Sequence, residues 1–192
     1  QLETLVARTI GPFVASPAIA NYTFKFDEAA GTARIEATGL SYTSWERDNE
    51  RWKLSLDKVL SGNNFSPDRT RPAWREIPVS TGRPGSTSVT TRLTLPDGAS
   101  GYTVEGKGAL DENVAGGKIV RTSTLAGGVW TVVTHVAGSG AEIPASAIPA
   151  ERRRLADLKA QPLRVVAPDP APAYWQQAED AKRRKLTAPM LA

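Results

Sequence analysis

The sequence predicts a mainly β fold, an antiparallel β-sandwich with a short helix near residues 149–160 and a C-terminal helix. Two observations carry this prediction. Short segments alternate apolar and polar residues, and 16 glycines and 14 prolines separate these segments with turns at short intervals. Short strands joined by turns are typical of a sandwich rather than of alternating strand–helix units. No fixed-period repeat runs through the chain, which argues against a propeller or a β-helix.

The 192 residues fit one domain with an appendage. We expect residues 1–20 to form an N-terminal linker, with one helical turn near its start. Residues 21–168 are then the sandwich domain. Residues 169–192 hold a proline spacer and a C-terminal helix, the expected start of helical repeats.

The first predicted element is a hairpin. Residues 22–26 alternate three aromatic side chains with Thr23 and Lys25, and residues 32–37 alternate again. Residues 27–31 between them form a turn that ends in a glycine. Each strand therefore has one apolar face, which we expect to be buried.

Further strands follow along the chain. The most marked hairpin joins residues 118–125 to residues 129–136 through Ala126-Gly127-Gly128. Other alternating runs lie at residues 52–57, 89–95, 102–105 and 163–166. Trp52 and Trp130, in regular strands, are expected in the core, where a tryptophan buries a large apolar area. The remaining predicted core residues are Phe24, Ile35, Leu54, Leu93, Val120 and Val132.

Two helices are predicted near the C-terminus. The first begins at Pro149 with Glu151 in its first turn, where proline and a negative charge are favoured. The second covers residues 173–186 and has an apolar stripe that includes Trp175 and Leu186. This stripe has too few large side chains to stabilise an isolated helix. We therefore expect the helix to lean on following helices or on a second copy, which predicts weak self-association.

The net charge of +4 lies entirely in the tail. The first 150 residues contain fifteen basic and fifteen acidic side chains, and the rest contain nine and five. Basic runs attract anionic surfaces, but solvated helix faces are the commoner explanation. We expect no nucleic-acid partner. The longest apolar runs are a few residues, so no transmembrane segment is predicted.

The composition excludes several kinds of chemistry. With no cysteine, the chain has no disulfide, thiol nucleophile or cysteine-bound zinc. Its single histidine, His135, is not expected to be catalytic, because no nucleophile elbow surrounds any serine. We expect this histidine at the surface or at a sheet edge. Adjacent acids such as Asp111 and Glu112 point to opposite faces of a strand, which argues against paired-carboxylate catalysis. We expect no catalytic residue, metal or cofactor in this chain.

Four residues form the candidate interaction surface: Trp45, Trp74, Trp175 and Leu186. One alternative is that the tryptophans stack on sugars. Exposure of Trp45 and Trp74 on one face, beside Asp or Asn, would favour glycan or cell-wall-polymer binding. Burial of both would favour a domain that packs on another protein.

Several turn and strand segments recur in a familiar order: residues 67–69, 73–79, 91–98, 102–106, 113–117, Arg121, 125–128, 131–132 and 141–144. Their order resembles that in a known family of bacterial envelope proteins, which join a β-rich domain of unknown function to a transglutaminase-like domain. In that family tetratricopeptide helices often follow, and residues 173–186 are similar to their start.

The resemblance implies that this chain is a C-terminal region of a longer, periplasmic or cell-envelope protein. The family's catalytic core uses a Cys-His-Asp triad, and no triad residue can be assigned here, since the chain has no cysteine. The implied function is therefore a non-catalytic accessory domain. Its implied partner is its own upstream transglutaminase-like domain or another protein.

Overall fold

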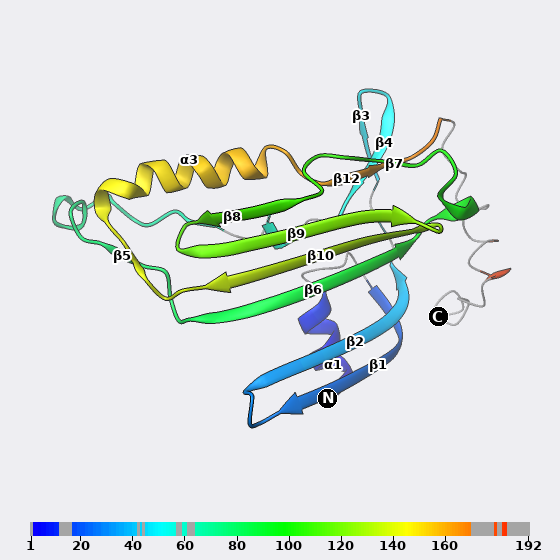
Figure 1. Cartoon of the computed structure of the whole chain (residues 1–192), viewed down its shortest axis with the longest axis horizontal. Coiled ribbons are helices and arrows are strands. Elements are labelled where there is room, and N and C mark those ends of the chain that lie inside the picture. Colours follow the sequence, from blue (N-terminus) through cyan, green and yellow to red (C-terminus); the bar gives the residue numbers. More distant parts are fainter. Residues whose placement is uncertain are drawn as a thin grey trace. The chain divides into compact units, whose positions relative to one another are not determined.

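The computed structural model describes residues 2–11, 17–41, 43, 45–56, 59–60, 64–169, 179 and 182–183. The chain is mainly β and its sheets are antiparallel, as the sequence predicts (Figure 1). It divides into two compact units: Gln1–Leu54 with Ala167–Ala192, and Ser55–Val166. These units differ from the predicted segments 1–20, 21–168 and 169–192, because the first hairpin groups with the N-terminal helix rather than with the later strands.

The first unit opens with a helix and two hairpins. Where a linker with one helical turn was expected, α1 spans nine residues and packs against β1. Strand β1 pairs with β2, with Phe24 opposite Ile35, and the register shifts between Ile19 and Asn21. The elements are α1 (Leu2–Ile10), β1 (Pro17–Asp27), β2 (Thr32–Ser41), β3 (Glu46–Asp48) and β4 (Arg51–Ser55).

The turn between β1 and β2 forms where the sequence places it. Its backbone is held by Asp27, whose Oδ1 accepts the Ala30 N–H at 3.0 Å. Gly31 adopts a φ of 60°, a conformation that a residue without a Cβ takes easily. The predicted hairpin of residues 22–37 is therefore confirmed.

The second unit contains the longest sheet. Its four strands lie in the order β6-β10-β9-β8, and every neighbouring pair is antiparallel. Two shorter antiparallel pairs, β11 with β5 and β12 with β7, complete its strands. The strands are β5 (Val79–Ser80), β6 (Gly85–Thr94), β7 (Thr103–Glu105), β8 (Leu110–Val114), β9 (Gly117–Ala126), β10 (Val129–Gly138), β11 (Glu142–Ile143) and β12 (Arg164–Val166).

One face of this long sheet is the core face. Alternate side chains of β10 point into it, and Trp130, Val132 and Thr134 are all buried. The predicted helix near 149–160 is confirmed as α3 (Ile148–Lys159), which runs along β8 in Figure 1. Leu155 and Leu158 of α3 belong to the same hydrophobic cluster as Leu60, Leu110, Val114 and Ile119.

The burial of the predicted core is mixed. Leu54, Val132 and Trp130 are buried as expected, while Ile35 and Leu93 are half-buried. Phe24 was predicted in the core and this is wrong, since it is 39% exposed on a two-stranded hairpin. Val120 lies on the other face of the long sheet and is only half-buried.

Trp52 corrects a second core prediction. It shares a face of β4 with Leu54, yet it is 40% exposed while Leu54 is buried. Trp52 lies next to the turn between β3 and β4, at the end of the hairpin, where fewer elements surround a side chain. The alternation of apolar and polar residues along β4 therefore predicted the face on which Trp52 lies, but not how deeply its side chain is buried.

The predicted C-terminal helix falls almost wholly outside the described residues. Within them, Glu179, Lys182 and Arg183 are helical, whereas Trp175 and Leu186 are not described. No helix in the described part of the chain is both long and apolar enough to cross a membrane.

Candidate interaction surface

The most unusual surface feature of the described residues is an apolar face on the β1–β2 hairpin. Tyr22, Phe24 and Phe26 are 36%, 39% and 61% exposed. They alternate along β1, so they share one face, and their cross-strand partners share it too. We call this set the aromatic face: Tyr22, Phe24, Phe26, Ala33, Ile35 and Ala37.

The opposite face of the same hairpin is polar. Arg34 donates from Nε to Glu36 Oε1 at 3.0 Å, and Lys25 lies across from Arg34. The hydrogen bond from Arg34 and its positive charge lower the pKa of the Glu36 carboxyl below the usual value. The hairpin is thus amphipathic, with a solvated charged side and an apolar side.

Most of the exposed large hydrophobic side chains of the described residues lie on the aromatic face. Five large hydrophobic side chains are exposed in the described part of the chain, and three of them lie here; the others are Trp52 and Ile77. Single exposed hydrophobic residues are ordinary, but a contiguous exposed apolar patch marks an interaction site. This face can therefore bind another apolar surface.

The structure does not place the predicted interaction residues Trp45 and Trp74 together on one exposed face. Trp74 is half-buried in the short 3₁₀ helix η1 (Pro72–Trp74), and the Arg71 guanidinium lies 4.5 Å from its ring centroid. Arg69 holds this loop by donating to the carbonyl oxygens of Trp74 and Ile77, the latter at 2.8 Å. One face of the Trp74 ring is thus occupied by a cation rather than open to a ligand.

Trp45 is also half-buried, and it belongs to the first unit whereas Trp74 belongs to the second. Trp175 and Leu186 lie outside the described residues. Neither Trp45 nor Trp74 is fully exposed or fully buried. Their exposure therefore favours neither glycan binding nor packing on another protein.

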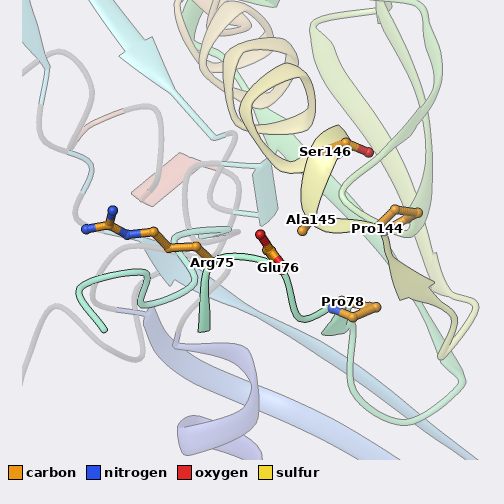
Figure 2. Close-up of a pocket in the computed structure, with 6 residues that line it drawn as sticks. All are labelled: Arg75, Glu76, Pro78, Pro144, Ala145 and Ser146. Carbon is orange, nitrogen blue, oxygen red and sulfur yellow. The ribbon is translucent and has the colours of Figure 1, made fainter. Parts of the chain in front are cut away.

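A cavity of about 500 Å³ lies beside the loop that follows η1, and Figure 2 shows its lining. In that view the Arg75 guanidinium extends away from Glu76 and from the other labelled side chains. Because its charged groups do not converge on one point, the cavity lacks the arrangement expected of a catalytic or anion site. The lining residues are Arg75, Glu76, Pro78, Pro144, Ala145 and Ser146.

A second cavity, of about 480 Å³, lies near the turn between β8 and β9. Two of its three charged lining residues, Glu151 and Lys118, are engaged in structural contacts, and the third is the exposed Glu142. Glu151 Oε2 accepts the Ala115 N–H at 2.6 Å, and Lys118 forms an ion pair with Asp111. These contacts tie α3 and β9 to their neighbours.

The titratable residues considered for catalysis are also dispersed. His135, predicted at the surface or at a sheet edge, lies in the interior strand β10, opposite Ser88 and Val120, so it is not at a sheet edge. It is half-buried on the face away from Trp130, as the alternation predicts. Within the described residues, no group of three or more His, Cys, Asp or Glu side chains could hold a metal ion.

Asp111 and Glu112 point to opposite faces of β8, which confirms that part of the sequence analysis. Asp111 lies across from Val120, and Glu112 lies across from Ile119. Glu112 Oε2 accepts a hydrogen bond from Arg154 Nη2 at 2.6 Å, which ties β8 to α3. Each carboxylate therefore has a structural partner of its own.

No protein-family model, curated protein or solved structure matches this chain. The function must therefore be argued from the described residues and from the resemblance noted in the sequence.

Sequence reasoning assigned the aromatic face to the core and so missed it as a surface. The signal was present in the alternation of residues 22–26. Alternation identifies an apolar face, but it does not say whether the covering layer belongs to the same chain.

Proposed function

We propose that this chain is a non-catalytic accessory β domain of a transglutaminase-like bacterial envelope protein. It docks through the aromatic face onto the transglutaminase-like core, or onto a partner of that core, and positions it. The observation that carries the proposal is the exposure of Tyr22, Phe24 and Phe26 on one side of a hairpin. The family resemblance of the strand and turn phrases supplies the partner and a periplasmic or cell-envelope location.

The energetics favour a protein partner for this face. A two-stranded hairpin is marginally stable in water by itself, and it gains stability when its apolar face is covered. Full burial of one Phe side chain contributes about 1.5–3 kcal/mol. Three aromatic side chains at the centre of an interface are the type of residue that dominates protein binding energy.

Glycan binding is less well supported. A sugar site combines aromatic rings with convergent polar groups, and the aromatic face carries one polar group, the Tyr22 hydroxyl. Trp74, the other candidate for stacking, has Arg71 against its ring. The aromatic face is therefore better suited to an apolar protein surface.

The test begins with the full reading frame from which this chain derives. We expect it to encode a transglutaminase-like region with a Cys-His-Asp triad. That region, purified separately, should bind this chain in isothermal titration calorimetry with a negative heat-capacity change, which marks apolar burial. The Phe24→Ser/Phe26→Ser variant should weaken binding by at least about 100-fold, since hot-spot residues each contribute ~2 kcal/mol or more.

The matched control is Thr23→Ser/Lys25→Ser, which changes the polar face of the same strand and should leave the affinity within about twofold. Circular dichroism checks that both variants keep their β content. A reading frame without such a region, or equal binding by both variants, would overturn the proposal.

A further inference from the structure

In the described part of the chain, the outer edge of β2 is an unpaired strand edge. The β1–β2 hairpin is a two-stranded sheet, so no further strand pairs with β2 in the described part of the chain. Residues 32–34 and 36–39 are exposed. An edge of this length is a template for another strand unless proline, a bulge or an inward-facing charge interrupts it.

The two strands of the hairpin differ in the features that can block pairing at a strand edge. β1 begins at Pro17 and has a register irregularity between Ile19 and Asn21. β2 contains no proline, and its pairing runs without a skipped residue from Thr32 to Gly39. The proline and the register irregularity are therefore found on β1, whereas the charged residues of β2 are Arg34 and Glu36, which have opposite signs.

The sequence of β2 is self-complementary around Ile35. Residues 32–38 read Thr-Ala-Arg-Ile-Glu-Ala-Thr, a palindrome in which Arg34 and Glu36 occupy matching positions. If two such strands run antiparallel with Ile35 opposite Ile35, each Arg34 lies directly across from the other strand's Glu36. Ala33 then faces Ala37, and Thr32 faces Thr38. Opposite charges directly across an antiparallel pair are stabilising, and like charges are destabilising.

We propose that a second copy of this chain pairs with the outer edge of β2, antiparallel and centred on Ile35. The product is a four-stranded sheet in the order β1-β2-β2-β1, built around a two-fold axis. This symmetry is the commonest in homo-oligomers, and it makes the same patch serve both partners.

The charged groups needed for this pairing are accessible. The Arg34 and Glu36 side chains are 75% and 58% exposed, and within one copy they contact each other along the strand. In the paired sheet each guanidinium also meets the carboxylate of the second copy. Two cross-strand ion pairs form on the polar face for every dimer.

The same register aligns the apolar face. Across the joined sheet, one row of residues reads Phe24, Ile35, Ile35, Phe24, and the next reads Tyr22, Ala37, Ala33, Phe26. Aliphatic residues lie at the centre and aromatic residues at the outside. Pairing therefore doubles the aromatic face. It uses the strand edge rather than that face, so it does not depend on the proposed function.

Charge reversal gives a specific test by sedimentation equilibrium on the full chain. The wild type should show a reversible monomer–dimer equilibrium. Arg34→Glu and Glu36→Arg should each weaken dimerisation at least about tenfold, because two attractive pairs become repulsive. An equimolar mixture of these two variants should dimerise again, since one copy then carries glutamate at both positions and the other carries arginine at both. The double variant Arg34→Glu/Glu36→Arg should also dimerise like the wild type.

The matched control is Arg92→Glu, which reverses an exposed charge on β6 and should leave the dimer unchanged. A monomeric wild type, or single reversals that leave the dissociation constant unchanged, would overturn the proposal. So would a mixture in which no dimer returns. The Arg34→Glu variant should still bind the transglutaminase-like region, which separates failure of this inference from failure of the proposed function.

Crosslinking tests the register directly, because the chain contains no cysteine. Ile35→Cys places two thiols on directly opposed residues, whose Cα separation of about 4.5–5.5 Å suits a disulfide. Phe24→Cys places them about three strand spacings apart, roughly 14 Å, which is too far. Mild oxidation should therefore give a covalent dimer with Ile35→Cys and little with Phe24→Cys. Equal yields from both variants would contradict the register.

Discussion

Two neighbouring leucines show how steeply burial changes at the end of β6. Leu95 is 2% exposed, and its N–H donates to the Gly128 carbonyl at 2.9 Å. Leu93, predicted in the core, is half-buried. We predict that Leu95→Ala lowers the free energy of unfolding by about 3–5 kcal/mol and Leu93→Ala by about 1–2 kcal/mol. Urea denaturation measures both, and an equal loss would show that the two leucines are packed alike.

At the same scale, Tyr102 predicts a pH dependence. Burial, with a smaller contribution from the negative charge of Asp97, raises the pKa of Tyr102 to about 12. The unfolded chain loses this proton near pH 10 and the folded chain near pH 12. The stabilisation is therefore complete below pH 10 and is lost as the pH rises toward 12.

Tyr102→Phe should remove this part of the alkaline destabilisation, about 1 kcal/mol at pH 11, because phenylalanine has no proton to lose. Thermal melting at pH 8 and pH 11 measures it. Tyr22→Phe, at an exposed tyrosine, is the control. If the melting temperatures of the wild type and of Tyr102→Phe fall by the same amount between pH 8 and pH 11, burial of the Tyr102 hydroxyl is not the cause of the alkaline destabilisation.

At the scale of elements, α3 is joined to the long sheet by apolar and polar contacts. Glu151 in its first turn accepts the Ala115 N–H, and Ala115 lies in the β8–β9 turn with a φ of 51°. Glu151→Ala should cost about 1–3 kcal/mol of unfolding free energy, because a charged hydrogen bond is lost and the Ala115 N–H is left without its acceptor.

Asp157→Ala, on the exposed side of the same helix, is the control and should change stability by less than about 0.5 kcal/mol. Urea denaturation compares the two variants. A Glu151→Ala variant as stable as the control would show that the apolar packing of α3 is sufficient by itself.

At the scale of the whole molecule, the division into two units makes a prediction about the C-terminal residues. Residues 169–192 belong to the first unit, whereas the long sheet belongs to the second. Deleting residues 169–192 should leave the hydrogen exchange of β9 and β10 amides and the melting of that sheet almost unchanged. The deletion should reduce any self-association that depends on the predicted C-terminal helix. A large fall in melting temperature would show that these residues support the long sheet.

Much of the fold could be predicted from the sequence. Local signals that act over a few residues predict the turns at residues 27–31 and 126–128, the β9–β10 hairpin and the helix near 149–160. The opposite orientation of Asp111 and Glu112 follows from strand geometry alone. The candidate surface was less predictable. Trp45 and Trp74 were chosen by residue type, but side-chain type does not reveal that Arg71 lies against one of them.

The sequence by itself determined which residues share a face, because the period of a strand is two whatever surrounds it. It also determined the palindrome around Ile35, which is a property of residue order. Tertiary structure alone decided which faces are covered. α3 packs against the face that carries Ile119, whereas Phe24 remains 39% exposed on its hairpin. Burial requires a second layer from a distant part of the chain, or from another molecule, and no local pattern of residues specifies that layer.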